Sequence, residues 1–228
     1  MRRLRRPAPS HLQTGERRTV TLDPLIESRL TARRPTWSDR PYFALAMGGG
    51  SASGKSTIAG QLSARLAPLR VEVLGQDRFF KPADDLPPYL STSRPQPWPD
   101  YNRPDSFRLD ELVEACAQPR DVDVLILEGI LVLHYPEVRA LMDLCLYVDA
   151  DADERIVRRI RRNLEHYSID DIADYYLESV RFQHDRYNAP TKAHADRVIP
   201  GGAADEEERE ALLQELCEAL KKRLPPAF

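Results

Sequence analysis

One eight-residue run constrains this chain more than any other stretch, and it reads Gly49-Gly50-Ser51-Ala52-Ser53-Gly54-Lys55-Ser56. The run fits the pattern G-x-x-x-x-G-K-[ST] at every defining position. The apolar residues 42–47 before it are typical of a buried strand, and residues 57–62 after it predict a helix. This order of strand, loop and helix predicts a phosphate-binding loop. A turn that merely joins a strand to a helix would not need Gly-Lys-Ser at this spacing.

Each residue type in the run has its own chemical role. Glycines let successive backbone N–H groups point at one phosphate chain, and the helix N-terminus adds partial positive charge. Lys55 is expected to neutralise the β- and γ-phosphates, and the Ser56 hydroxyl is placed to bind Mg²⁺. ATP and Mg²⁺ are therefore the expected cofactors. The residues expected around the phosphates are Gly49, Gly50, Ser51, Ala52, Ser53, Gly54, Lys55, Ser56 and Thr57.

Length and composition set limits on the class of protein. The 228 residues are 42% hydrophobic and carry a net charge of -3, which fits one α/β domain without a general attraction to nucleic acid. No apolar stretch is long enough to span a bilayer, so no membrane partner is expected. The three cysteines are odd in number and lack metal-ligand spacing, which predicts reduced thiols in a cytoplasmic protein.

The first 40 residues differ from the rest of the chain. They hold ten arginines against four acids and few large apolar residues, which predicts a loosely ordered basic extension. A solvated tail is one interpretation, and an arm that touches polyphosphate or RNA is the other. Residues 41–228 are then expected to form the P-loop domain, and a homo-oligomer is possible.

Strand and helix patterns alternate along that domain. Apolar runs predict strands at 42–47, 70–75, 123–129, 144–149 and 197–200, and amphipathic patterns between and after them predict helices. This alternation predicts a P-loop NTPase fold, an α/β fold with a five-stranded parallel sheet and helices on both faces. Asp105 or Ser106 is expected to cap a helix over 107–116.

Two acids follow predicted strands at the edge where parallel sheets bind ligands. Asp77 follows the strand at 70–75 and suits a general base, although an N-cap or turn aspartate is the plainer interpretation. Glu128 ends the strand at 123–129 and is expected to hold Mg²⁺ or its water. The stretch 82–104 between them contains seven prolines, which predicts either a semi-rigid cover over the site or a surface excursion packed on its own aromatic residues.

An arginine-rich helix is predicted over 151–164. Its arginines at 155, 158, 159 and 162 share one helical face, and we expect no interleaved acids there. A solvated charged face is one interpretation. Because such a face repels itself unless anions are near, we favour a phosphate-clamping lid. Ser168 and Asp171 then form a capping box for a helix that runs through Tyr175.

Several motifs together resemble the uridine kinase family over roughly residues 43–202. They are G-G-S-A-S-G-K-S-T, Q-D-R-F-F-K-P, I-L-E-G-I-L, V-D-A-D-A-D-E-R-I-V-R-R and A-P-T-K-A-H-A-D-R-V-I-P, in this order. The resemblance implies an ATP-dependent phosphotransferase that acts on an alcohol group. It implies that Asp77 deprotonates the ribose 5′-hydroxyl, that Phe80 lies beside the sugar, and that Arg159 and Arg162 lie near the substrate sugar and the ATP phosphates, so that Arg159 also binds substrate. Together with Lys55 of the phosphate-binding loop, Asp77, Arg159 and Arg162 are the expected catalytic residues.

The chain departs from the uridine kinase pattern at two binding elements. Tyr101-Asn102 stands where the family has an aromatic-Asp pair that grips the ribose 2′ and 3′ hydroxyls. The family hairpin that reads the pyrimidine is missing, because residues 116–121 pass directly to the next strand. This short connection and Q-D-R-F-F-K-P are more similar to nicotinamide riboside kinase.

A small-molecule kinase is the function that these patterns favour, because the N-K-x-D and L-S-G-G-Q motifs of other P-loop proteins are absent. The expected acceptor is a nucleoside or another ribosyl compound. A sugar-like or pantothenate-like alcohol is the alternative within the enzymes. A nucleotide-binding regulator with little turnover is the alternative outside them.

Overall fold

A parallel sheet of five strands forms the centre of the protein in its computed structural model, which describes residues 42–92, 95–118 and 120–224. The strand order is β2-β5-β1-β6-β7, and every neighbouring pair is parallel. This confirms the predicted α/β fold. The basic extension over 1–40 lies outside the described residues. The strands are β1 (Phe43–Gly49), β2 (Val71–Gly75), β5 (Val124–Glu128), β6 (Leu144–Asp149) and β7 (Arg197–Pro200).

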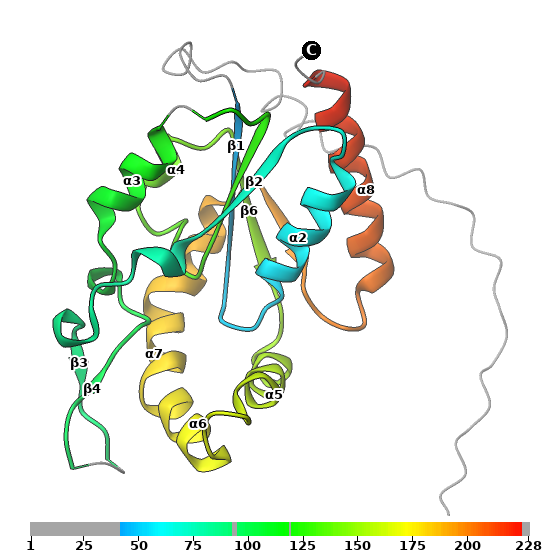
Figure 1. The fold of residues 1–228 in the computed structure, drawn as a ribbon. Coiled ribbons are helices and arrows are strands. Elements are labelled where there is room, and N and C mark those ends of the chain that lie inside the picture. Colours follow the sequence, from blue (N-terminus) through cyan, green and yellow to red (C-terminus); the bar gives the residue numbers. More distant parts are fainter. Residues whose placement is uncertain (1–41, 93–94, 119, 225–228) are drawn as a thin grey trace, which may run out of the picture.

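Alternation along β1 explains why the sheet is covered on both faces. Leu45 and Met47 belong to one buried cluster, and Ala44 and Ala46 belong to the other. Side chains that alternate in this way need apolar partners on both sides. Figure 1 shows the two helical layers on either side of the sheet. The first layer holds α2 (Lys55–Arg65) and α8 (Glu206–Arg223), and the second holds α3 (Leu109–Ala117) and α4 (Pro136–Ala140).

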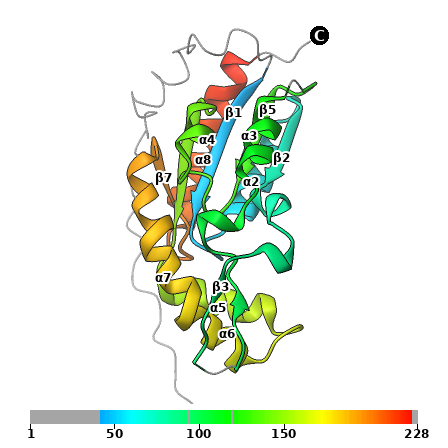
Figure 2. The ribbon, with the colours of Figure 1, turned by 90° about the vertical axis from the view of Figure 1, so that its left-hand side faces the viewer.

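Two further helices and a short hairpin lie beyond the carboxyl ends of the strands, below the sheet in Figures 1 and 2. The predicted arginine helix is α5 (Ala152–Asn163), and it leads to α6 (Ile169–Tyr175), which begins at the predicted Ser168–Asp171 capping box. The proline-rich stretch contributes an antiparallel hairpin of two-residue strands, β3 (Pro88–Tyr89) and β4 (Trp98–Pro99).

The helix that α6 starts continues far beyond it and widens twice. A π-helical turn over Tyr176–Val180 leads to α7 (Arg181–Gln183), and a second π turn covers His184–Asn188. A 3-10 turn over Ala189–His194 ends the run before β7. Turns of this width inside helices occur frequently at functional sites.

The predicted start of α3 is wrong by two residues. A 3-10 turn occupies Pro104–Ser106, and the helix begins at Leu109 without a side-chain cap. The Ser106 hydroxyl instead donates a 2.5 Å hydrogen bond to the Asp100 carbonyl. A buried hydroxyl needs a hydrogen-bond partner, and this bond joins the 3-10 turn to the residue that follows β4.

Two further expectations concern cysteines and membrane helices. Cys116, Cys145 and Cys217 are all buried, and none of them forms a disulfide within the described residues. Among the helices of the described ranges, none has both the length and the apolar character that crossing a bilayer requires.

The two sides of α2 predict opposite effects of alanine on stability. Leu62 is fully buried against the sheet, so Leu62→Ala should lower the free energy of unfolding by about 2 to 5 kcal/mol. Gly60 lies on the exposed side, where an added Cβ meets no atom within 4 Å. Gly60→Ala should raise the free energy of unfolding by about 0.5 to 1 kcal/mol. Urea unfolding of both variants measures this, and loss of stability in Gly60→Ala would contradict the placement of α2.

Candidate active site

The phosphate-binding loop has the backbone geometry that its glycines predict. Gly49 and Gly54 have φ angles of 141° and 103°, which side chains other than hydrogen rarely allow. At Gly49 an added Cβ would lie 2.4 Å from the Val148 carbonyl oxygen, so β6 also demands glycine here. The loop is held from the far side by Asn188, whose Nδ2 donates to the Gly49 carbonyl at 3.0 Å.

Lys55 lies at the start of α2, with only 6% of its surface exposed. Its ammonium group donates a 2.8 Å hydrogen bond to the Gly50 carbonyl. Burial lowers the pKa of Lys55 to about 8, although the charges of Glu128 and Asp77 act in the opposite direction. The lysine is therefore a desolvated cation that a phosphate chain would stabilise.

Ser56 and Glu128 meet across the carboxyl edge of the sheet. The Ser56 hydroxyl donates to the Glu128 carboxylate at 3.1 Å. One hydroxyl and one carboxylate fit Mg²⁺, which commonly takes one or two protein ligands and completes its shell with water and substrate phosphates. No group of three or more acidic, histidine or cysteine ligands exists among the described residues, so these two side chains would hold the ion only together with nucleotide.

A pocket of about 960 Å³ joins the loop, the lid helices and the hairpin. It contains every side chain that the sequence proposes for catalysis, substrate binding or metal binding. Of the nine predicted phosphate-loop residues, Gly49, Gly50 and Ser53 do not line it and instead shape the backbone. The predicted residues that line it are Ser51, Ala52, Gly54, Lys55, Ser56, Thr57, Asp77, Phe80, Tyr101, Asn102, Glu128, Arg159 and Arg162.

Asp77 enters this pocket from a 3-10 turn over Gln76–Phe79, directly after β2. Its side chain is exposed and accepts no hydrogen bond from any residue in the described ranges. Gln76, beside it, is fully buried and accepts the backbone N–H of Leu131 at 2.9 Å. The turn is thus anchored by its neighbour, which leaves the Asp77 carboxylate available to a ligand.

Aromatic rings form the wall next to Asp77. Phe80 stacks on Phe107 with ring centroids 4.4 Å apart, and Tyr101 meets the edge of Phe80 at 5.1 Å. Trp98 also lines the pocket, from the hairpin strand β4. Flat apolar surfaces of this kind can bind the faces of a sugar or a base.

The lid arginines do not act as one uniform face. Arg159 donates to the Ser51 hydroxyl at 2.9 Å and lies over the Tyr175 ring at 5.3 Å, and burial lowers the pKa of its guanidinium. Arg162 lines the pocket on the same side. Arg155 is 6% exposed, is absent from the pocket wall and donates to the Ala150 carbonyl.

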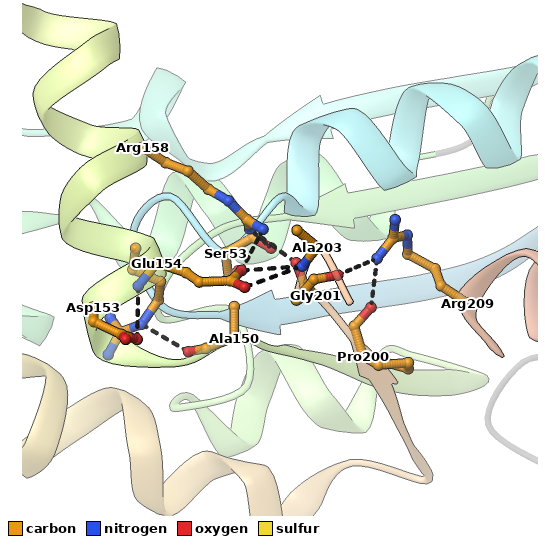
Figure 3. A network of polar contacts seen from close by, with 11 residues as sticks. Ser53, Ala150, Asp153, Glu154, Arg158, Pro200, Gly201, Ala203 and Arg209 are labelled. Carbon is orange, nitrogen blue, oxygen red and sulfur yellow. Dashed lines mark hydrogen bonds and ion pairs between the residues drawn. The ribbon is translucent and has the colours of Figure 1, made fainter. Parts of the chain in front are cut away.

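The expectation that no acid interrupts this face is wrong at Arg158. Glu154 accepts an ion-paired hydrogen bond of 2.6 Å from Arg158, one helical turn away, and it also accepts the backbone N–H of Ala203. Arg158 donates in turn to the Gly201 carbonyl at 2.9 Å. Figure 3 shows these contacts between α5 and the loop after β7. Arg158 therefore ties the lid helix to that loop, and its charge is already paired with Glu154.

Two residues of this site have no role in the predictions from the sequence. The Tyr175 hydroxyl lies 2.9 Å from the Asn102 side-chain nitrogen and 3.3 Å from the Tyr101 backbone nitrogen, and burial raises the pKa of Tyr175 to about 12. Asp100 lies behind Asn102 and is fully buried. The four-residue spacing of Tyr175, Ser179 and Gln183 is a signal for a polar helical face, and these three residues contact the 100–102 segment.

Comparisons with known proteins agree with this arrangement. The model of the phosphoribulokinase / uridine kinase family matches residues 99–206. A uridine kinase of Brevibacillus brevis is 34% identical over 185 residues, which cover 69% of this chain and 84% of that protein. A uridine kinase of Clostridium botulinum strain Langeland is 31% identical over 181 residues, which cover 68% of this chain and 85% of that protein.

One solved structure is similar in fold at low identity. It is the crystal structure of a protein described as a fructose transport system kinase from Silicibacter sp. TM1040. The match has a TM-score of 0.53 at 19% identity, and it covers 78% of this chain and 96% of the other.

The lowered pKa of Lys55 predicts that ATP binding weakens at alkaline pH. The charged form binds phosphate, and the free protein loses that charge as the pH rises through about 8. The affinity for a non-hydrolysable ATP analogue should therefore fall above that pH, by up to about tenfold per pH unit. Calorimetric titration from pH 7 to 9.5 measures this. Lys55→Arg is the control, because its guanidinium stays charged over this range and its weaker binding should be independent of pH. A flat wild-type affinity would contradict the prediction.

Proposed function

The chain belongs to the phosphoribulokinase / uridine kinase family, and from this membership we propose that it transfers the γ-phosphate of ATP to a hydroxyl group of a ribosyl compound. The coarser statement, a phosphotransferase of the uridine kinase type that acts on an alcohol group, follows from the family itself. The observation that carries the finer proposal is the shared pocket, in which the Asp77 carboxylate, which accepts no hydrogen bond from a described residue, lies with Lys55 and the lid arginines. We also propose that the protein works in the cytoplasm.

The proposed reaction begins with the acceptor hydroxyl beside Asp77. The carboxylate accepts the hydroxyl proton as the oxygen attacks the γ-phosphorus, the bond to the β-phosphate oxygen breaks, and ADP leaves. Lys55, Arg159 and Arg162 would spread the negative charge of the transferring group. Mg²⁺, held by Ser56 and Glu128 together with the phosphates, would supply further charge neutralisation.

The acceptor would lie between the aromatic wall and the hairpin. Phe80 is proposed to contact the sugar, and Tyr101 and Asn102 to bind its hydroxyl groups. An amide oxygen accepts a hydrogen bond from a hydroxyl less strongly than a carboxylate does. Such an oxygen can still bind the hydroxyl groups of a ribosyl compound, which is the proposed acceptor class, and a sugar-like or pantothenate-like alcohol is the alternative.

Loss of the proposed base should affect the rate more than binding. Asp77→Asn keeps the shape of the side chain but cannot accept the proton, so kcat should fall on the order of 100-fold to 10,000-fold. The KM values for acceptor and ATP should change little, as steady-state kinetics would measure. Asp84→Asn is the matched control, since Asp84 is exposed in the next turn and outside the pocket. A kcat within about threefold of wild type, with collapsed acceptor affinity, would make Asp77 a binding residue.

The acceptor preference should be broad. Only a short connection links α3 to β5 in the described residues, and it contains no hairpin strand that could read a pyrimidine. The kcat/KM values for uridine, cytidine, nicotinamide riboside and adenosine should therefore lie within about 1,000-fold of one another, because hydrogen-bond readout alone gives larger ratios. A stronger preference for uridine or cytidine would show that another segment reads the base.

Trp98 offers a variant for the same measurement. Stacking on a base is worth roughly 1 to 3 kcal/mol and tolerates different bases, so Trp98→Ala should raise the KM for all nucleosides alike but not for free ribose. Leu90→Ala is the control, since Leu90 is 83% exposed on the same hairpin and does not line the pocket.

A further inference from the structure

The carboxylate of Asp100 is buried just behind the pocket wall. It follows β4, has no exposed surface, and is not among the residues that line the pocket. Its Oδ1 accepts from the Asn102 backbone N–H at 2.9 Å, the Asn102 Nδ2 at 3.3 Å and the Ser179 hydroxyl at 2.9 Å. Its Oδ2 accepts from the Gln183 Nε2 at 2.8 Å. Within residues 42–92, 95–118 and 120–224, no lysine or arginine pairs with it.

A carboxylate in this position is costly for the fold. Burial of a charge is unfavourable unless hydrogen bonds compensate it, and all four of its donors here are neutral groups. The network joins the hairpin to the wide helical turn over Tyr176–Val180 and to α7. Apolar residues could join the same elements, so the buried charge calls for a reason other than stability.

The contacts of Asn102 supply that reason. Its Nδ2 faces inward to the oxygens of Asp100, Tyr175 and Ser179. A flipped amide would place its own oxygen against the Asp100 carboxylate, where two acceptors repel. The carboxylate therefore decides which way the amide lies. The Asn102 Oδ1 receives no hydrogen bond from any described residue, and Asn102 lines the pocket.

We propose that Asp100 is a positioning residue of the acceptor site, which acts through Asn102 by holding its amide nitrogen inward and its carbonyl oxygen toward the acceptor. The site then presents a neutral acceptor oxygen, and the carboxylate of Asp100 lies behind it, away from the pocket surface. An acceptor such as a ribosyl compound has further hydroxyl groups in addition to the one that reacts. One of these donates a hydrogen bond to the Asn102 oxygen. This inference rests on the proposed function for its substrate, but the contacts that it describes do not.

The test compares Asp100→Asn, Asn102→Asp and the double exchange of the two residues. An amide at position 100 can donate as well as accept, so Asp100→Asn no longer selects one orientation of Asn102. The KM for uridine or nicotinamide riboside should rise up to about tenfold, the scale of one hydrogen bond between neutral groups. The kcat and the KM for ATP should stay within about twofold. The double exchange places a carboxylate at the pocket and an amide behind it, and it should restore the acceptor KM.

Two sets of controls separate positioning from a purely structural role. Asp105→Asn makes the same change in an exposed aspartate of the same segment and should leave both KM values unaltered. With 2′-deoxyuridine and 3′-deoxyuridine as probes, the effect of Asp100→Asn should disappear for the one that lacks the donating hydroxyl. A fall in thermal stability and kcat with equal changes in both KM values, without recovery in the double exchange, would overturn the proposal.

A second measurement does not depend on turnover. In ¹⁵N-labelled wild-type protein, the side-chain N–H groups of Asn102 should exchange slowly with solvent, and in Asp100→Asn this protection should be lost. Retained protection in that variant would overturn the proposal. If the wild-type protein phosphorylates none of these probes, the proposed function fails, and the exchange measurement still decides whether Asp100 orients the amide.

Discussion

The buried ammonium group of Lys55 is the charge around which the rest of the site is arranged. It lies at the start of α2, just after the loop that follows β1, and within the described residues its one hydrogen bond goes to the carbonyl oxygen of Gly50. A desolvated cation of this kind is unfavourable in the free protein and becomes favourable when an anion arrives. The carboxylates of Asp77 and Glu128 act on it from the neighbouring strand ends. The fold thus keeps a charge ready for a ligand at some cost to its own stability.

The lid follows the same physical principle with arginines. Arg159 is desolvated and lies near the like charge of Arg162, and both effects lower the pKa of its guanidinium. The Tyr175 ring and the Ser51 hydroxyl offset part of this cost. Arg158 differs, because Glu154 already pairs with it. The arginines of α5 therefore differ in role. Arg158 fixes the helix to the loop after β7, whereas Arg159 and Arg162 line the pocket without an acidic partner among the described residues.

Local sequence patterns predicted much of this fold and site. Apolar runs located the five strands of the parallel sheet to within two residues at every end, because such runs in a parallel sheet are buried on both faces. The residues proposed for the pocket share it because they follow the carboxyl ends of those strands. The pair of Arg158 with Glu154 was also within reach, since the two residues are one helical turn apart.

The contacts that remained hidden join residues far apart in the chain. Asn102 and Tyr175 are 73 residues apart, and their meeting depends on where the hairpin packs against the lid. No local pattern marks a wide helical turn, so the sequence could not place Ser179 against Asp100. The same limit applies to the capping of α3, where the Ser106 hydroxyl satisfies a carbonyl in the hairpin instead.

The helical run over 169–194, with its two π turns, contacts two separate parts of the pocket, the 100–102 segment and the phosphate-binding loop. At one end, Ser179 and Gln183 donate hydrogen bonds to Asp100, in the segment 100–102 behind the pocket wall. At the other, Asn188 binds the Gly49 carbonyl of the phosphate-binding loop. Because each residue advances a helical chain by a fixed angle around the axis, about 100° in an α-helix, the number of residues between Ser179 and Asn188 fixes the directions in which the two sets of contacts point. The number of residues between these contacts is therefore as constrained as their chemical identity. A change in length here would misalign the 100–102 segment and the phosphate-binding loop while leaving every side chain of the pocket present.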